Sequence, residues 1–195
     1  MRIDGLTRSL HICMVITVLF QMLSSLWMFT PEPGKMVGYE TILYSWHIMF
    51  IGWSSVTIAC VYAMLRFAEY HEWTRLIPWF SASKRALFLK SAKEEIPGVF
   101  KGELAPPENR GALAGAMHGF GFLLLIAMGL TGSYAMLGIR PDGTTSADMT
   151  LMFELHSWGG VFVWFFLTAH VSMVIYHVIL GHYKVLDVFQ IRQKK

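Results

Sequence analysis

The chain has 195 residues, of which 16 are Lys or Arg and 13 are Asp or Glu. Its 54% hydrophobic content and mean hydropathy of +0.47 exclude a disordered chain, an ordinary soluble domain and a secreted disulfide scaffold. The charged residues are absent from four stretches of 23, 25, 29 and 29 residues, at 9–31, 41–65, 111–139 and 155–183. Each stretch reaches the ~20 apolar residues that a helix needs to cross a bilayer.

The first expected span covers about 9–29 and ends at Thr30-Pro31-Glu32-Pro33-Gly34, because a double proline followed by glycine does not continue a helix. Its apolar run is too long for a cleaved signal peptide, so we expect it to be retained. The second span is expected at about 40–66. Cys13 and Cys60 lie in these two spans and are expected to be buried thiols rather than a disulfide.

A long loop at 67–111 separates the two halves of the chain. It is predicted to contain a short amphipathic helix at 83–92, which stops before the breakers Pro97-Gly98. The third and fourth spans follow at about 112–137 and 150–182. The pattern predicts a single domain at residues 1–195, an all-α integral membrane four-helix bundle with up-down-up-down topology.

The basic residues indicate the orientation of this bundle. With both termini on one side of the membrane, that side carries 14 of the 16 basic residues, and only Lys35 and Arg140 remain opposite. The positive-inside rule then places both termini and the 67–111 loop in the cytoplasm. We therefore expect a multi-pass protein of the bacterial inner membrane, surrounded by lipid, with no nucleic-acid partner.

Seven of the eight histidines lie in the charge-free stretches, where a polar side chain is costly. A single buried histidine is most often only a hydrogen-bonded residue, so position has to decide. His156 and His170 are 14 residues apart, which places them on nearly the same helix face and roughly 21 Å apart along the axis. His11 lies near the cytoplasmic start of the first helix, at a depth that pairs it with His170. His47 lies near the outer start of the second helix, at a depth that pairs it with His156.

Two such pairs suit haem iron, because neutral imidazole is a good axial ligand and two of them leave no open position for other chemistry. The sequence therefore predicts two non-covalent b haems, with His11, His47, His156 and His170 as axial ligands. No Cys-x-x-Cys-His motif is present, so covalent attachment is excluded. Zinc would need ligands that converge at one depth. A proton relay stays open, although the spans lack the buried Asp or Glu that it would more naturally include.

The histidines lie in the motifs Leu10-His11, Ser45-Trp46-His47, Leu155-His156-Ser157-Trp158 and Ala169-His170-Val171. These motifs resemble those of the di-haem cytochrome b subunits of respiratory complexes. Within this group, the chain resembles the gamma subunit of membrane-bound formate dehydrogenase and the cytochrome b subunit of membrane-bound nickel–iron hydrogenase. The resemblance extends over almost the whole chain. It implies the same histidine pairing, and a place in an oxidoreductase complex beside a periplasmic catalytic, iron–sulfur or cytochrome subunit.

The resemblance also implies a quinone site. Formate dehydrogenase gamma subunits carry an Asn-x-Gly before the third helix, which lines a quinone pocket beside the inner haem. Asn109-Arg110-Gly111 occupies the matching place here, so Asn109, Gly111 and His170 are the implied quinone contacts. Asn109 as a simple cap of the third helix is an equal interpretation. His118 and His177 have no ligand counterpart; His118 is expected to be structural or close to quinone, and His177 structural or a carrier of protons near the cytoplasmic surface.

The expected function is thus a membrane di-haem b-type cytochrome that transfers electrons across the bilayer between a periplasmic redox partner and the quinone pool, with quinone reduced on the cytoplasmic side. Two alternatives remain at this point. One is a cytochrome that oxidises quinol and feeds a terminal reductase. The other is a haem-free anchor subunit whose histidines pair with each other or with the backbone.

Overall fold

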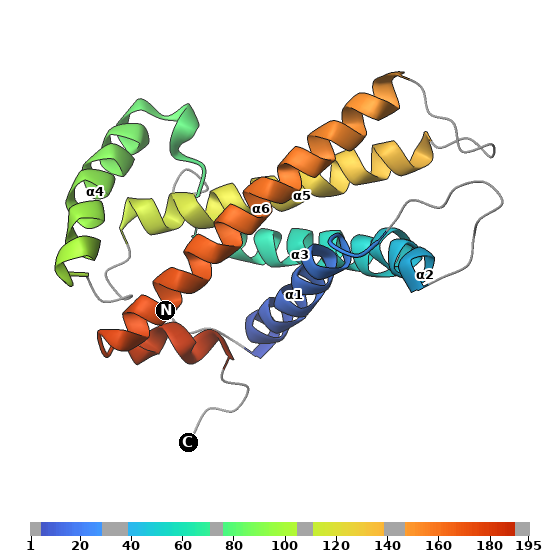
Figure 1. The fold of residues 1–195 in the computed structure, drawn as a ribbon. Helices are drawn as coiled ribbons and strands as arrows, with labels where there is room; N and C mark the ends of the chain where they lie inside the picture. Colours follow the sequence, from blue (N-terminus) through green and yellow to red (C-terminus); the bar gives the residue numbers. More distant parts are fainter. Residues whose placement is uncertain (1–4, 29–38, 71–75, 105–110, 139–146, 190–195) are drawn as a thin grey trace. The chain divides into compact units, whose positions relative to one another are not determined.

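The computed structural model describes residues 5–28, 39–70, 76–104, 111–138 and 147–189 (Figure 1). Throughout these ranges the regular structure is helical. Four helical stretches are long and apolar enough to cross a membrane: Gly5–Ser24, Ile42–Ala68, Ala112–Leu137 and Asp148–Ile179. The prediction of an all-α integral membrane protein is therefore confirmed.

The first two spans differ in their regularity. Helix α1 (Gly5–Ser24) is continuous. The second span consists of α2 (Tyr39–Ser45), the π-helix η1 (Trp46–Gly52) and α3 (Trp53–Tyr70). A π-helix is rare, and single π turns inside helices occur often at functional positions. Here it contains His47, whose carbonyl accepts a hydrogen bond of 2.8 Å from the side-chain amide of Gln21.

The 67–111 loop contains a longer helix than the sequence predicts. Helix α4 (Ala82–Lys101) passes through Pro97 instead of ending before it. Proline removes one N–H donor from the ladder and its ring crowds the carbonyl four residues earlier, but Pro97 lies on an exposed face and α4 continues past it. The helix ends instead at Gly102, whose φ of 75° suits glycine, and the N–H of Glu103 donates to the carbonyl of Gly98 over 2.9 Å.

The last two spans are α5 (Ala112–Leu137) and α6 (Ala147–Ile179), and the short 3-10 helix η5 (Tyr183–Phe189) follows α6. Large apolar side chains of α6 point outward: Trp158, Phe165 and Ile179 are 66%, 70% and 72% exposed. Such an apolar surface suits contact with lipid, and the hydrogen bonds within a helix satisfy the backbone polar groups of its interior there.

The chain forms two compact units, and each spanning helix contributes to both. The first unit comprises Met1–His11, Tyr62–Leu123 and Phe166–Lys195, and the second comprises Ile12–Val61 and Leu124–Phe165. His11, His118 and His170 belong to the first unit, whereas His47 and His156 belong to the second. Each histidine pair that the sequence suggests therefore falls within one unit.

Candidate functional site

In the second unit, the imidazole rings of His47 and His156 lie next to each other in an edge-to-face arrangement. Their centroids are 6.5 Å apart and their planes are inclined by 80°. Two imidazoles on opposite sides of one metal ion place their centroids roughly 6 Å apart, since each metal–nitrogen bond is about 2 Å and the centroid lies about 1 Å behind the nitrogen. The spacing of the two rings therefore suits a pair of axial ligands.

Two hydroxyl groups orient these rings. The Nδ1 atom of His47 is 2.8 Å from the Ser24 hydroxyl, and Nδ1 of His156 is 3.2 Å from the Thr131 hydroxyl. A hydrogen bond at one ring nitrogen selects the other nitrogen for ligation and fixes the plane of the ring. Nε2 is consequently the nitrogen that each histidine has available for a metal ion.

The surroundings of this pair also suit an additional group. A Cβ atom at Gly132 of α5 would lie 2.8 Å from Cε1 of His156, so only glycine leaves the ring its position. The hydroxyl of Tyr44, one turn before His47, is buried and has no hydrogen-bond partner among the described residues. An unpaired buried polar atom is costly, and a bound group with polar substituents would relieve that cost.

In the first unit, His11 and His170 are close enough to interact electrostatically. Nδ1 of His11 is buried and has no hydrogen-bond partner among the described residues. Tyr62 and Phe189 flank the His11 ring, with centroid distances of 5.9 Å and 5.2 Å. Phe166 stacks on His170 at 5.6 Å with an interplanar angle of 19°. The site is thus an aromatic-lined histidine pair with an unsatisfied ring nitrogen.

A third histidine adjoins this pair. His118 of α5 packs edge-on against His170, with centroids 5.5 Å apart and an interplanar angle of 85°. Its Nδ1 is 2.7 Å from the carbonyl of Ala114, which orients the ring. The proximity of His118 to His170 is not predicted from the sequence. Their depths are similar, however, because His118 lies six residues after the start of α5 and His170 lies nine residues before the end of α6.

Buried positive charge lies in the same unit. Arg8 and Arg66 are each 7% exposed, and Arg66 interacts electrostatically with His11. Guanidinium groups form paired hydrogen bonds with carboxylates. The first unit therefore combines imidazole side chains with guanidinium groups, which are suited to binding the carboxylates of a cofactor.

The predicted quinone contacts are only partly within the described residues. Asn109 lies outside them. Gly111 lies at the start of α5, where a Cβ atom would collide with the Ser91 hydroxyl and the Glu95 carboxylate of α4. Ser91 donates a hydrogen bond to Glu95 and accepts one of 3.3 Å from the N–H of Leu113.

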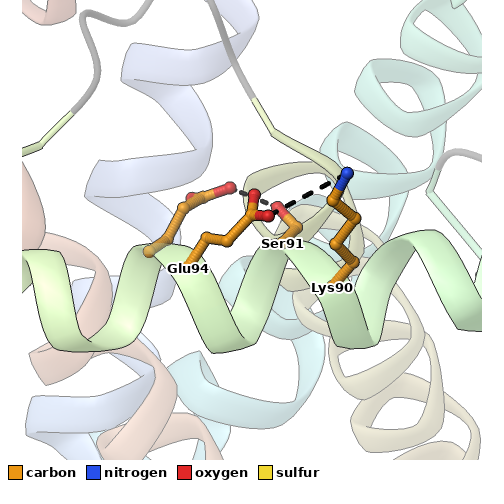
Figure 2. A network of polar contacts seen from close by, with 4 residues as sticks. Lys90, Ser91 and Glu94 are labelled. Atoms are coloured by element: carbon orange, nitrogen blue, oxygen red, sulfur yellow. Dashed lines mark hydrogen bonds and ion pairs between the residues drawn. The ribbon is translucent and has the colours of Figure 1, made fainter.

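This contact gives Gly111 a packing role of its own, because its lack of a side chain lets α4 approach α5. Figure 2 shows Ser91 on α4 beside the ion pair between Lys90 and Glu94, which measures 4.0 Å and is largely exposed. The quinone contact of Gly111 stays a prediction, as does that of His170.

One family model matches the chain. It is described as prokaryotic cytochrome b561 and aligns with residues 2–189, nearly the full length. No curated protein and no solved structure gives a significant match. This family is a wider group than the formate dehydrogenase and hydrogenase subunits that the motifs resemble. Membership in it implies haem b binding and electron transfer in a membrane. The chain belongs to the prokaryotic cytochrome b561 family and is a multi-pass b-type cytochrome of the inner membrane.

Proposed function

We propose that this cytochrome holds two b haems, each between two histidines. His47 and His156 are the ligands of one iron, and His11 and His170 are the ligands of the other. The observation that carries the proposal is the proximity of His47 and His156 in the second unit, with 6.5 Å between ring centroids. In both histidines the Nδ1 atom contacts a hydroxyl group, which leaves the Nε2 atom as the nitrogen that can bind iron.

The roles of the protein residues follow from these contacts. Bound haem supplies reversible one-electron chemistry, and the protein supplies ligation, orientation and burial. Ser24 and Thr131 hold the rings of the second unit, while Gly132 keeps space beside His156. Arg8 and Arg66 provide buried positive charge in the first unit. Two histidines on each iron leave no open position, so the haems are suited to passing electrons rather than binding substrate.

Haem content tests this proposal directly. We expect purified protein to contain two haem b per chain, measured by the pyridine haemochrome method against protein concentration, and to show a b-type α-band in the dithionite-reduced minus oxidised spectrum. One haem per chain would contradict the paired arrangement. The absence of haem under conditions where related cytochromes retain it would favour the haem-free anchor.

We further propose that electrons pass between a periplasmic redox partner and quinone on the cytoplasmic side, with Asn109, Gly111 and His170 at the quinone. Reduction of a quinone to a quinol consumes two electrons and two protons, so the site needs a supply of protons as well as a haem. Gly111 and His170 belong to the same unit, and the Glu95 carboxylate lies against Gly111. These features support quinone reduction at this end of the molecule. Oxidation of quinol, with electrons leaving toward a terminal reductase, uses the same residues in reverse.

Asn109→Ala separates the quinone proposal from the haem proposal. Loss of one hydrogen bond to quinone is expected to slow the reoxidation of dithionite-reduced haem by a soluble quinone about tenfold, since ~1.4 kcal/mol corresponds to a factor of ten. The haem spectrum should stay normal, because Asn109 is not a proposed ligand.

A Glu94→Ala variant serves as the control for this measurement. Glu94 is 65% exposed and pairs only with a neighbouring lysine of α4 in the described contacts. Its reoxidation rate should equal that of the unmodified protein. Equal rates in Asn109→Ala and in the control would overturn the quinone role of Asn109.

A further inference from the structure

The C-terminal end of α6 is closed by a specific backbone motif. The N–H of His182 donates to the carbonyl of His177 over 2.8 Å, and the N–H of Gly181 donates to that of Val178 over 3.0 Å. Gly181 has a φ of 80°, which glycine adopts without strain. These two bonds define a Schellman motif, in which the residues at the positions of His177 and His182 commonly make an apolar contact. Here both positions carry histidine.

The two imidazoles converge at their Nδ1 atoms. Nδ1 of His177 is 3.1 Å from Nδ1 of His182, and the ring centroids are 5.4 Å apart with an interplanar angle of 43°. One shared proton accounts for this distance when no cation is present. With metal–nitrogen bonds of 2.0–2.1 Å, the same distance corresponds to a nitrogen–metal–nitrogen angle of about 100°, between square-planar and tetrahedral values. The Nδ1–Nδ1 distance is therefore compatible with both nitrogens binding one metal ion.

We propose that His177 and His182 form a binding site for an exchangeable divalent cation of the Zn²⁺, Cu²⁺ or Ni²⁺ class. Imidazole suits these ions, whereas Mg²⁺ and Ca²⁺ prefer oxygen ligands. Within the described ranges, no cluster of three or more His, Cys, Asp or Glu side chains is suited to a metal ion. Two protein ligands completed by water characterise a reversible site rather than a structural one. This site uses neither the proposed haem ligands nor the proposed quinone contacts.

The backbone prepares the site before the cation arrives. The Gly181 turn and the backbone bond from His182 to His177 fix the backbone at both positions, so less conformational entropy is lost on binding than in a flexible segment. The site also lies at the connection between α6 and η5, both of which contribute residues to the histidine pair of the first unit. Helix α6 carries His170, and η5 carries Phe189, which packs against His11 at 5.2 Å and 72°. A bound cation would stabilise this connection.

The test uses haem-loaded protein in detergent, purified without a polyhistidine tag. Zn²⁺ affinity is measured by competition with a chromophoric chelator, and the Cu²⁺ complex is examined by electron paramagnetic resonance. We expect a site of one cation per chain that Mg²⁺ does not compete for, with hyperfine splitting from two nitrogen ligands. The double variant His177→Gln/His182→Gln should lower the affinity by more than the roughly 10- to 100-fold that loss of an outer-shell partner costs.

Two further variants make the result specific. His71→Gln removes a histidine that lies outside the described residues and should leave the affinity unchanged. Gly181→Val keeps both imidazoles but strains the turn, and should weaken binding. Haem spectra and size-exclusion profiles show that each variant is folded. Undiminished Zn²⁺ binding in the double variant, or a Cu²⁺ spectrum with fewer than two nitrogens, would overturn the proposal.

Discussion

Replacing His47 with alanine is expected to halve the haem content of the protein, from two haems per chain to one. His156 would remain as a single imidazole, and loss of one of two iron ligands is expected to weaken the binding of a non-covalent haem enough to lose it during purification. His11 and His170 belong to the other unit and share no contact with His47 among the described interactions, so their haem should stay bound. Pyridine haemochrome analysis gives the content, and a redox titration should then show one midpoint instead of two.

His177→Ala is the matched control for this experiment. His177 lies in α6, the helix that carries His156, and its Nδ1 atom is 3.1 Å from Nδ1 of His182, which is not a proposed haem ligand. Its haem content should remain at two per chain. Loss of both haems in His47→Ala, or of neither, would contradict the pairing of His47 with His156.

Among Gly119, Gly121, Gly129 and Gly132 of α5, a methyl group at Gly119 is expected to cause the largest loss of stability. The Cβ atom would collide with the backbone carbonyl of Leu76, a residue that is only 2% exposed. Backbone cannot rotate away as a flexible side chain does, so the helix or the Leu76 segment must shift. Overpacking of this kind costs about 1–3 kcal/mol or more, whereas the gain in helix propensity is at most ~1 kcal/mol. Thermal loss of the folded peak in size-exclusion chromatography measures the effect.

Gly160→Ala in α6 provides the comparison. A Cβ atom at Gly160 would have no neighbour within 4 Å among the described residues. This substitution should leave the stability unchanged or raise it slightly, because alanine loses less backbone entropy than glycine in a helix. If both variants melt at the same temperature, the close approach of α5 to Leu76 is not a source of stability.

The spans were largely predictable from composition, because transfer of charge into lipid dominates every weaker preference. Helix α5 has the bounds expected from the charge-free stretch, Ala112–Leu137. Positions governed by smaller energies were missed. Pro97 does not end α4, since one lost backbone bond on an exposed face is outweighed by the remaining ladder. The π-helix around His47 was also not predicted. The side-chain amide of Gln21, on another helix, donates a hydrogen bond to the carbonyl of His47.

In the candidate sites, too, some features could be predicted from the sequence and others could not. The 14-residue interval between His156 and His170 sets their face and their separation along one helix. The residues whose hydroxyl groups orient the histidine rings could not be predicted from the spacing of residues along one helix. Ser24 and Thr131 are two of many hydroxyl residues in the chain, and only the packing of α1 and α5 brings them to His47 and His156.

The amino-acid sequence alone establishes that this protein crosses the membrane, and it predicts which histidines share a depth, because charge exclusion and helical rise act along one helix at a time. The packing of the helices establishes which groups contact those histidines: the hydroxyls at Nδ1, His118 beside His170, and the glycine that leaves room for His156. Such contacts join residues far apart in the chain. They depend on how side chains interdigitate between helices, and the period of a single helix carries no information about that packing.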